Sequence, residues 1–149
     1  MEFHYRHWAS FGIGSSVTFT GGGGFMEVTA TLLERDAEKV VLQIRCRTRG
    51  LQDLDFTETL RPTRTTGGCF FPVHLENGEF RTGAEVIEIG GEEWLSRWVE
   101  SSARYLDKDV TVKSWIVDQV PGGIARWQMR ERPSEPHPLT WNVMRFQRK

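Results

Sequence analysis

The first residues of the sequence that could do chemistry are His4 and His7, because His-x-x-His spacing can supply two ligands to a metal ion. A zinc site needs three or four nitrogen, sulfur or oxygen ligands that converge at close range. The other histidines, His74 and His137, lie far along the chain, and no pattern brings them to the pair. The pair lies at a chain end, where fraying is usual. The sequence therefore favours two incidental histidines at an ordered or disordered terminus, and we expect neither a metal nor another cofactor.

Residues 12–16, Gly-Ile-Gly-Ser-Ser, superficially look like a loop that cradles a phosphate group. Such a loop needs a strand before the glycines and a helix N-terminus after them, so that backbone N–H groups point at the phosphate. The residues that follow here, Val17-Thr18-Phe19, favour a strand instead. We therefore interpret the glycines as a β-turn.

Nucleophiles and acids give no specific catalytic pattern. The sequence contains no Gly-x-Ser-x-Gly motif around a serine. Cys69 and His74 could form a thiolate pair, and Glu85, Glu88 or Asp118 could contribute to an acid pair. With 20 acidic residues in the chain, some such pair is always available, whereas an active site needs one with shifted pKa values in a pocket. The sequence therefore leans against catalysis, and an enzyme of unknown reaction remains an alternative.

The tryptophans are the more informative feature, since the chain has six of them and five fall in its second half. Trp115, Trp127 and Trp141 lie on three consecutive predicted strands, so they could be neighbours across a sheet. Tryptophan offers a large apolar area and one N–H donor, which suits a ligand cavity, a sugar-stacking face or a protein interface. The alternative is that these side chains simply form the core, and both roles coincide if the sheet curls around a pocket. We predict that a concave face binds an apolar ligand through Trp94, Trp98, Trp115, Trp127 and Trp141.

Strands must position these side chains, and their patterns are clear in several places. Residues 40–48 alternate with a period of two, with Val40, Leu42 and Ile44 on one face and Arg45 on the other, as in a strand with one solvated face. Similar reasoning predicts strands at residues 16–20, 25–35, 84–89, 109–118, 124–132 and 139–148. Turn or loop signals separate them at residues 21–24, 61–68, 77–78, 90–91, 120–123 and 133–138.

Residues 92–106 fit two kinds of element. Trp94, Leu95, Trp98 and Val99 have near-helical spacing, which would give a curved sheet packed on one helix. The same residues also read as a long strand with Trp94 and Trp98 on one face. We favour the strand, because the neighbouring elements are strands and residues 107–109 would close a hairpin with the next one.

Composition limits the class of protein. A chain of 149 residues with 38% hydrophobic and 26% charged residues is typical of one globular domain, here residues 1–149. A net charge of -1 supplies no general attraction for nucleic acid, and no apolar run is long enough to span a membrane. Cys46 and Cys69 could form one disulfide or be two buried thiols. We see no apolar leader segment in the first residues, and the compartment is left open.

Two segments carry a resemblance to small, mostly uncharacterised bacterial proteins. Residues 115–124, Trp-Ile-Val-Asp-Gln-Val-Pro-Gly-Gly-Ile, resemble their Trp-x-x-(Ser/Asp)-x-x-Val-Pro-Gly-Gly turn, which follows a Lys/Thr-rich strand, here residues 110–113. Residues 8–17 are similar to their opening, and the final strand at 139–146 has a matching place. The resemblance implies an open or half-closed antiparallel barrel, similar to the periplasmic lipoprotein-carrier fold, whose curved sheet embraces an apolar ligand. It implies no catalytic residues, and although many of those proteins are exported, this chain shows no leader.

The sequence thus predicts a mainly β domain, a curved antiparallel meander that forms an open or half-closed barrel, with one helix as an option. The favoured function is non-enzymatic binding of a hydrophobic small molecule, lipid chain or peptide on the tryptophan-bearing face. The alternative partner is another protein, against which a structural or assembly subunit would bury that face or a sheet edge. Within the turn at residues 120–123, proline fixes φ and the glycines supply positive φ, so we interpret this motif as structural.

Overall fold

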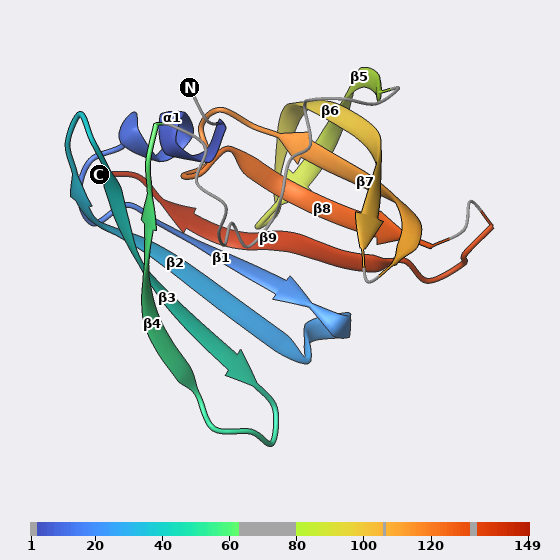
Figure 1. Cartoon of the computed structure of the whole chain (residues 1–149), viewed down its shortest axis with the longest axis horizontal. Helices are drawn as coiled ribbons and strands as arrows, with labels where there is room; N and C mark the ends of the chain where they lie inside the picture. The colour runs from blue at the N-terminus through green and yellow to red at the C-terminus, as the bar shows by residue number, and fades with distance from the viewer. Residues whose placement is uncertain (1–2, 63–79, 106, 132–133) are drawn as a thin grey trace.

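The strands pair in one open, nine-stranded antiparallel sheet in the computed structural model, which describes residues 3–62, 80–105, 107–131 and 134–149 (Figure 1). The strand order is β4-β3-β2-β1-β9-β8-β7-β6-β5. The strands are β1 (Ser16–Gly21), β2 (Met26–Arg35), β3 (Val40–Thr48), β4 (Leu54–Leu60), β5 (Phe80–Ile89), β6 (Glu92–Tyr105), β7 (Lys108–Ile116), β8 (Ile124–Arg130) and β9 (Leu139–Gln147). The predicted mainly β fold, an antiparallel meander, is confirmed.

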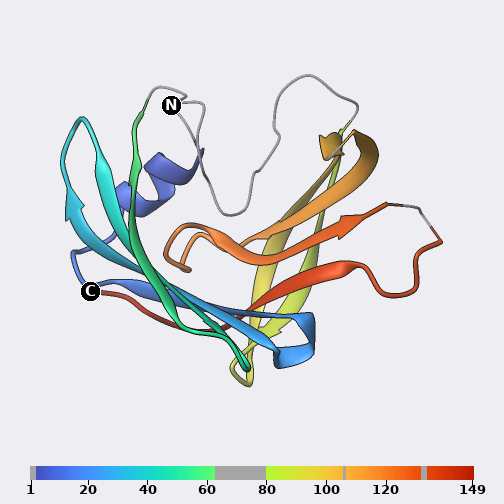
Figure 2. The same cartoon turned by 60° about the horizontal axis from the view of Figure 1, so that its bottom comes forward.

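Two runs of sequential hairpins build the sheet, and the pairing of β1 with β9 joins them. The register of that pair shifts between Thr18 and Phe19, which is the mark of a β-bulge. Bulges bend a strand and increase its twist. In Figure 2 the two halves accordingly diverge as separate arms, with β1–β4 on one side and β5–β8 on the other.

Residues 92–105 form the strand β6, so the favoured interpretation of this segment is confirmed and the helical alternative is wrong. β6 pairs with β5 through residues 92–101 and with β7 through residues 97–105. The backbone N–H and C=O groups of β6 form hydrogen bonds with two neighbouring strands, so they do not need the internal hydrogen bonds of a helix. Strand pairing therefore determines the structure of this segment, because its local residue spacing fits both a helix and a strand.

The helix α1 (Phe3–Ala9) and the strand β4 were not predicted. Of the ordered and disordered alternatives for this terminus, the structure shows the ordered one from Phe3 on, because α1 buries Phe3, Tyr5 and Trp8. A helix of seven residues is too short to be stable alone, so only packing against the sheet accounts for it. In β4, the acidic Glu58 interrupts the apolar alternation and obscures the strand pattern.

Two hydrogen bonds fix α1 beside the β2–β3 hairpin, and a third is local to the C-terminal end of the helix. Arg35 Nη1 donates to the Ala9 carbonyl oxygen at 2.9 Å, which satisfies a carbonyl at the end of the helix with a positive charge. Tyr5 Oη donates to the Asp36 carbonyl oxygen at 2.8 Å. Ser10 Oγ donates to the His7 carbonyl oxygen at 2.7 Å. The helix thus lies on the inner side of the β1–β4 half of the sheet (Figure 2).

The inner face of that half is a set of apolar rows that run across the strands. The register aligns Val17 with Ala30, Ala30 with Ile44, and Ile44 with Phe56. Directly paired residues in antiparallel strands point to the same side, so each row presents one continuous apolar surface. The opposite face is polar, as the hydrogen bond between the Thr18 and Thr29 hydroxyls at 2.9 Å illustrates.

The predicted β-turn is present at residues 12–15, where Ser15 N donates to the Gly12 carbonyl oxygen at 3.0 Å, and β1 begins at Ser16. Polar groups of these residues form hydrogen bonds with other residues of the chain. Gly14 N donates to the Leu32 carbonyl oxygen at 2.8 Å and Leu32 N returns a bond to the Ser15 carbonyl oxygen at 2.8 Å. Lys149 N donates to Ser15 Oγ at 2.9 Å. This segment therefore ties the C-terminal residue to the start of the sheet.

Tryptophan packs across glycine at two places in the sheet. Gly83 of β5 pairs with Trp98 of β6, and a Cβ atom at Gly83 would lie 2.4 Å from the Trp98 ring. Gly21 of β1 pairs with Trp141 of β9, where the corresponding distance is 2.7 Å. An aromatic ring laid over a strand glycine shields backbone that has no side chain of its own. These two indoles therefore need the glycines opposite them.

The Gly83→Ala substitution is expected to lower the free energy of unfolding by about 1–3 kcal/mol, because the new methyl group displaces the Trp98 indole. Urea unfolding of Gly83→Ala, Trp98→Ala and the double variant measures this. In the Trp98→Ala background the methyl group meets no ring, so the same change should cost less than about 0.5 kcal/mol. An equal cost in both backgrounds would contradict the proposed packing.

Candidate functional site

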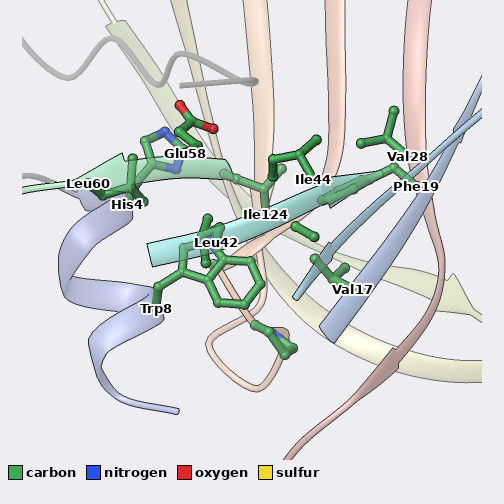
Figure 3. A pocket seen from close by; sticks show the side chains of 13 residues that line it. His4, Trp8, Val17, Phe19, Val28, Leu42, Ile44, Glu58, Leu60 and Ile124 are labelled. Carbon is green, nitrogen blue, oxygen red and sulfur yellow. The ribbon is translucent and has the colours of Figure 1, made fainter. Parts of the chain in front are cut away.

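A small apolar cavity lies between α1 and the inner face of β1–β4. Its volume is about 50 Å³, which leaves room for a few water-sized groups. Figure 3 shows side chains from the helix on one side and from the strands on the other, converging on this space. The lining residues are His4, Trp8, Val17, Phe19, Val28, Ala30, Leu42, Ile44, Glu58, Leu60, Pro121, Gly122 and Ile124.

The sheet supplies the apolar wall of the cavity. Val17 of β1 has no exposed surface, and Val28 and Ile44 of the neighbouring strands are 2% exposed. These residues belong to adjacent cross-strand rows of the inner face, so their spacing is set by the sheet hydrogen bonds. β-branched and aromatic side chains on a paired sheet have little freedom to move. The strand side of the cavity is therefore its rigid side.

The cover of the cavity consists of α1 and the turn at residues 117–123, between β7 and β8. Gly122 and Gly123 have φ of 84° and 80°, which confirms the predicted need for positive φ in this turn. The turn is closed by hydrogen bonds from Val117 N to the Gly123 carbonyl oxygen at 3.0 Å and from Gly123 N to the Val120 carbonyl oxygen at 2.8 Å. In this geometry Gly122 and Gly123 lie directly against α1.

The same glycines leave room for α1. A Cβ atom at Gly122 would lie 2.7 Å from the Trp8 ring, and one at Gly123 would lie 2.4 Å from the His7 ring. Either distance is far below van der Waals contact, so any larger residue would push the helix away. The helix α1 and the turn at residues 117–123 thus pack directly on each other, and their contact closes the cavity.

A polar contact strengthens this joint. His7, only 9% exposed, places Nε2 at 3.2 Å from Asp118 Oδ1 in the turn and Nδ1 at 3.0 Å from the Phe3 carbonyl oxygen. Arg97 Nη2 of β6 donates to the same Asp118 oxygen at 3.2 Å. Partial burial alone would raise the pKa of Asp118, but the hydrogen bond from His7 and the charge of Arg97 outweigh it and lower this pKa below its ordinary value.

Two titratable side chains stand at one end of the otherwise apolar lining. His4 of α1 is 6% exposed, and Glu58 comes from the edge strand β4. Figure 3 shows the His4 ring beside the Glu58 carboxylate, on the Leu60 side of the cavity. The cavity therefore combines an apolar body with a polar end, which is the usual composition of a site that orients a mainly apolar ligand.

The register divides the five predicted tryptophans between the two faces of the sheet. Trp127 pairs with Trp141, and Trp141 packs over Gly21 on the inner face. Trp115 pairs with Trp98, and its strand neighbour Ser114 is the residue that pairs with Trp127. Since adjacent residues of a strand point to opposite sides, Trp98 and Trp115 lie on the face opposite to Trp127 and Trp141. We call this the outer face, although Trp115 is buried there, at 3% exposure. The inner-face pair, Trp127 and Trp141, lies outside the cavity lining.

The rings of Trp98 and Trp115 on the outer face contact the ammonium group of Lys113. Lys113 Nζ lies 4.3 Å from the centre of the Trp98 ring and 4.5 Å from that of Trp115. Glu85 accepts a hydrogen bond from Trp115 Nε1 and lies 4.0 Å from Lys113 Nζ. Trp94 instead packs edge-on against Phe146, with ring centres 5.6 Å apart. These contacts stabilise the fold, and a ligand role for the five tryptophans stays a prediction.

The residues considered for catalysis are separated. Asp118 binds His7 and Arg97 at the cover, Glu85 contacts Trp115 on the outer face, and Glu88 is exposed on β5. Asp36, Cys46 and Asp118 have shifted pKa values, and none of the three lines the cavity. An enzymatic function stays a prediction with no residues assigned to it.

Several predictions fall partly outside the described residues, including the thiolate pair of Cys69 and His74. Cys46 is a free, half-buried thiol whose pKa is raised by burial, while its suggested partner Cys69 is not described. The predicted turn at residues 77–78 also lies outside the described residues. Across the described ranges, we find no cluster of three or more His, Cys, Asp or Glu side chains that could hold a metal ion. Their helices are also too short or too polar to cross a membrane.

Comparison of the chain with protein-family models, with curated proteins and with solved structures finds no match. The interpretation of the site therefore rests on its geometry.

Sequence reasoning missed most of the cavity lining. Trp8 was recognised only as part of a resembling segment, and His4 only as a candidate metal ligand. The helical spacing of Phe3 with His7 and of His4 with Trp8 is a usable signal, since residues three or four apart share one face of a helix. The strand wall at residues 40–44 was anticipated as an apolar face, although its contact with a helix was not.

Gly122→Ala is expected to destabilise the protein by about 1–3 kcal/mol more than Gly50→Ala, because only the first substitution also displaces an indole. Gly50 is a matched control, since its φ is 82° against 84° for Gly122, and no atom lies within 4 Å of a Cβ built there. Urea unfolding of both variants gives the difference. Equal losses of stability would show that Trp8 does not pack on Gly122.

Acidification is expected to remove a contribution of Asp118 to stability. The folded-state pKa of Asp118 is lowered, so its contribution is present above the ordinary unfolded value of about 3.9 and is lost as pH falls through the folded value. Unfolding free energies measured between about pH 6 and pH 2 should therefore fall more steeply for the natural chain than for Asp118→Asn. Parallel curves would be inconsistent with an ionised Asp118 in the folded state.

Proposed function

We propose that the chain binds a small apolar molecule, or the end of an acyl chain, between α1 and the inner face of β1–β4. The observation that carries this proposal is the cavity lining, which is apolar except at the His4 and Glu58 end. A rigid apolar wall on paired strands favours a ligand without polar groups along most of its length. The polar end favours a ligand with one hydrogen-bonding group.

The size of the cavity supports a cover that moves. Ligand sites commonly enclose roughly 300–1,000 Å³, whereas this cavity has about 50 Å³. The strands are held by continuous hydrogen bonding, while α1 is a seven-residue helix attached by a few side-chain contacts. A ligand larger than a few atoms therefore displaces α1 rather than the sheet.

The proposal keeps the ligand class that the sequence favoured and changes the contacts. Trp8 lines the cavity, whereas Trp127 and Trp141 continue the inner face beyond it. The alternative role as an assembly subunit stays a prediction. An interface on the β5–β6 hairpin would bury Val86 and Leu95, a cross-strand pair that is 59% and 73% exposed.

The binding of cis-parinaric acid, a fluorescent acyl chain, is expected to be saturable and to weaken at least about tenfold in Ala30→Leu. The larger side chain fills the cavity, because Ala30 lines it and is 7% exposed. Thr29→Val is the matched control, since Thr29 points to the opposite face of the same strand. Fluorescence titration gives the affinities, and thermal unfolding checks that each variant is folded.

Ala30→Val, which adds less volume, provides a second variant if leucine prevents folding. It should weaken binding less than leucine and more than Thr29→Val does. The proposed function is wrong if the natural chain shows no saturable binding, or if filling the cavity leaves the affinity unchanged.

A further inference from the structure

We propose that the edge strand β5 pairs antiparallel with β5 of a second copy of the chain, so that two nine-stranded sheets join into one continuous sheet. The proposal goes beyond the proposed function and does not depend on it. The cavity lies at the β1–β4 end of the strand order, whereas β5 is the last strand at the other end.

β5 has the features of an edge that is open to pairing. In the described part of the chain it pairs with β6 alone, over ten residues and without a register shift. Residues 81–86 of this strand are exposed, except for the half-buried Gly83. Edges that stay unpaired are usually protected by short length, bulges, lysine, proline or a charge that points inward. The segment 80–89 contains no lysine and no proline, and it runs without a bulge.

The strand at the other edge, β4, carries such protection. It is seven residues long, and its Glu58 points to the inner face, where it lines the cavity (Figure 3). A carboxylate on the apolar face of an edge strand opposes the addition of another strand, because the new strand would bury the charge among apolar side chains. The two edges of the sheet therefore differ, and β5 is the edge suited to association.

The charges of β5 fit a second copy of the same strand. Arg81 and Glu85 lie on one face of β5, with Gly83 midway between them. In an antiparallel pair of identical strands related by a two-fold axis, positions at equal distance from the centre lie opposite each other. A pair centred on Gly83 therefore places Arg81 of each copy opposite Glu85 of the other. Opposite charges at directly opposite positions stabilise a strand pair, and like charges destabilise it.

Neighbouring registers lose this match. A pair centred on Glu85 would place the two carboxylates opposite each other, and a pair centred on Ala84 would place Arg81 opposite Ile87. The charges of the strand thus select the register that is centred on Gly83.

Both charged side chains can reach a second copy. The Arg81 side chain is 80% exposed and that of Glu85 is 43% exposed. Within the chain, Arg81 binds Glu100 and Glu85 accepts a hydrogen bond from Trp115. A guanidinium has several N–H donors in a planar fork, and a carboxylate has several acceptor positions, so each group can keep its internal contact and bind a further partner.

Apolar contacts flank the ion pairs in this register. The half-buried Trp98 ring lies over Gly83 on the outer face. Directly paired positions in antiparallel strands are about 4.5–5.5 Å apart, so the two central glycines bring the Trp98 rings of both copies side by side. On the opposite face, the cross-strand pair of Val86 and Leu95 is 59% and 73% exposed beside the same edge. Pairing of the edges removes part of this apolar surface from water, which favours association.

Sedimentation velocity of the whole chain, from about 5 to 500 µM protein, tests the association. A contact through one strand lies at the weak end of specific interfaces, so we expect a dimer that forms as the concentration rises. Arg81→Glu places like charges opposite each other at both positions and should weaken the dimer at least about tenfold. Arg104→Glu is the matched control, because Arg104 is a 69% exposed arginine of β6 whose ion pair is with Asp109 of β7.

Thermal unfolding checks that both variants are folded. A natural chain that stays monomeric over the whole concentration range would overturn the proposal. A dimer of the same affinity in Arg81→Glu would overturn it as well.

Mixing two variants tests the register. Glu85→Arg alone also places like charges opposite each other, but a mixture of Arg81→Glu chains with Glu85→Arg chains restores opposite charges at both positions. Mixed dimers should therefore form at concentrations where each folded variant alone is monomeric. If they do not form, the register centred on Gly83 is wrong. Glu85→Gln, which keeps an acceptor for Trp115, is a second variant if Glu85→Arg does not fold, and it should weaken the dimer less than Arg81→Glu does.

Amide hydrogen exchange, followed by mass spectrometry at the two ends of the concentration range, locates the contact. Peptides from β5 should gain protection in the concentrated sample, because their outward N–H groups become hydrogen-bonded. Peptides from β4 should show no change. Protection that appears in β4 and not in β5 would contradict the pairing of β5 edges.

Discussion

The close approach of α1 to the glycines of the 117–123 turn is the contact on which the enclosure of the cavity depends. Trp8 and His7 occupy the space where side chains at Gly122 and Gly123 would stand. A seven-residue helix has little stability of its own, so this contact, rather than helix propensity, holds α1 on the sheet. Because α1 covers the inner face of β1–β4, the same contact closes the cavity.

The inner face of β1–β4 forms the wall against which α1 packs. Its bend, at the bulged pairing of β1 with β9, turns the apolar rows of β1–β4 inward and gives them a helix to pack on. The outer face carries a different set of contacts, in which Lys113 lies between Trp98 and Trp115. The tryptophans of the two faces are therefore held by different partners. The arrangement combines a wall of paired strands with a cover made by α1 and the 117–123 turn, and the proposed site for an apolar ligand is based on it.

Local patterns predicted the parts of the fold that depend on local properties. The alternation at residues 40–48 arises because β3 has one buried and one solvated face, and the predicted bounds match the strand. The positive φ of Gly122 and Gly123 followed from the turn motif. In contrast, the faces of Trp115 and Trp127 depend on the hairpin register, which shifts between Trp115 and Ile116 and is not encoded in either strand alone. The helix α1 was missed for a similar reason, since its stability comes from packing on the sheet and on a turn more than a hundred residues away in the sequence.

The most direct test of the joint between helix and turn is the NMR spectrum of Gly122 in the ligand-free chain. With the Trp8 indole against this glycine, the α-protons of Gly122 should show nuclear Overhauser contacts to the indole protons. Their chemical shifts should also differ clearly from those of a glycine in an unstructured peptide, because of the ring current. Unshifted α-protons without contacts to Trp8 would contradict the account, since α1 would then not close the cavity.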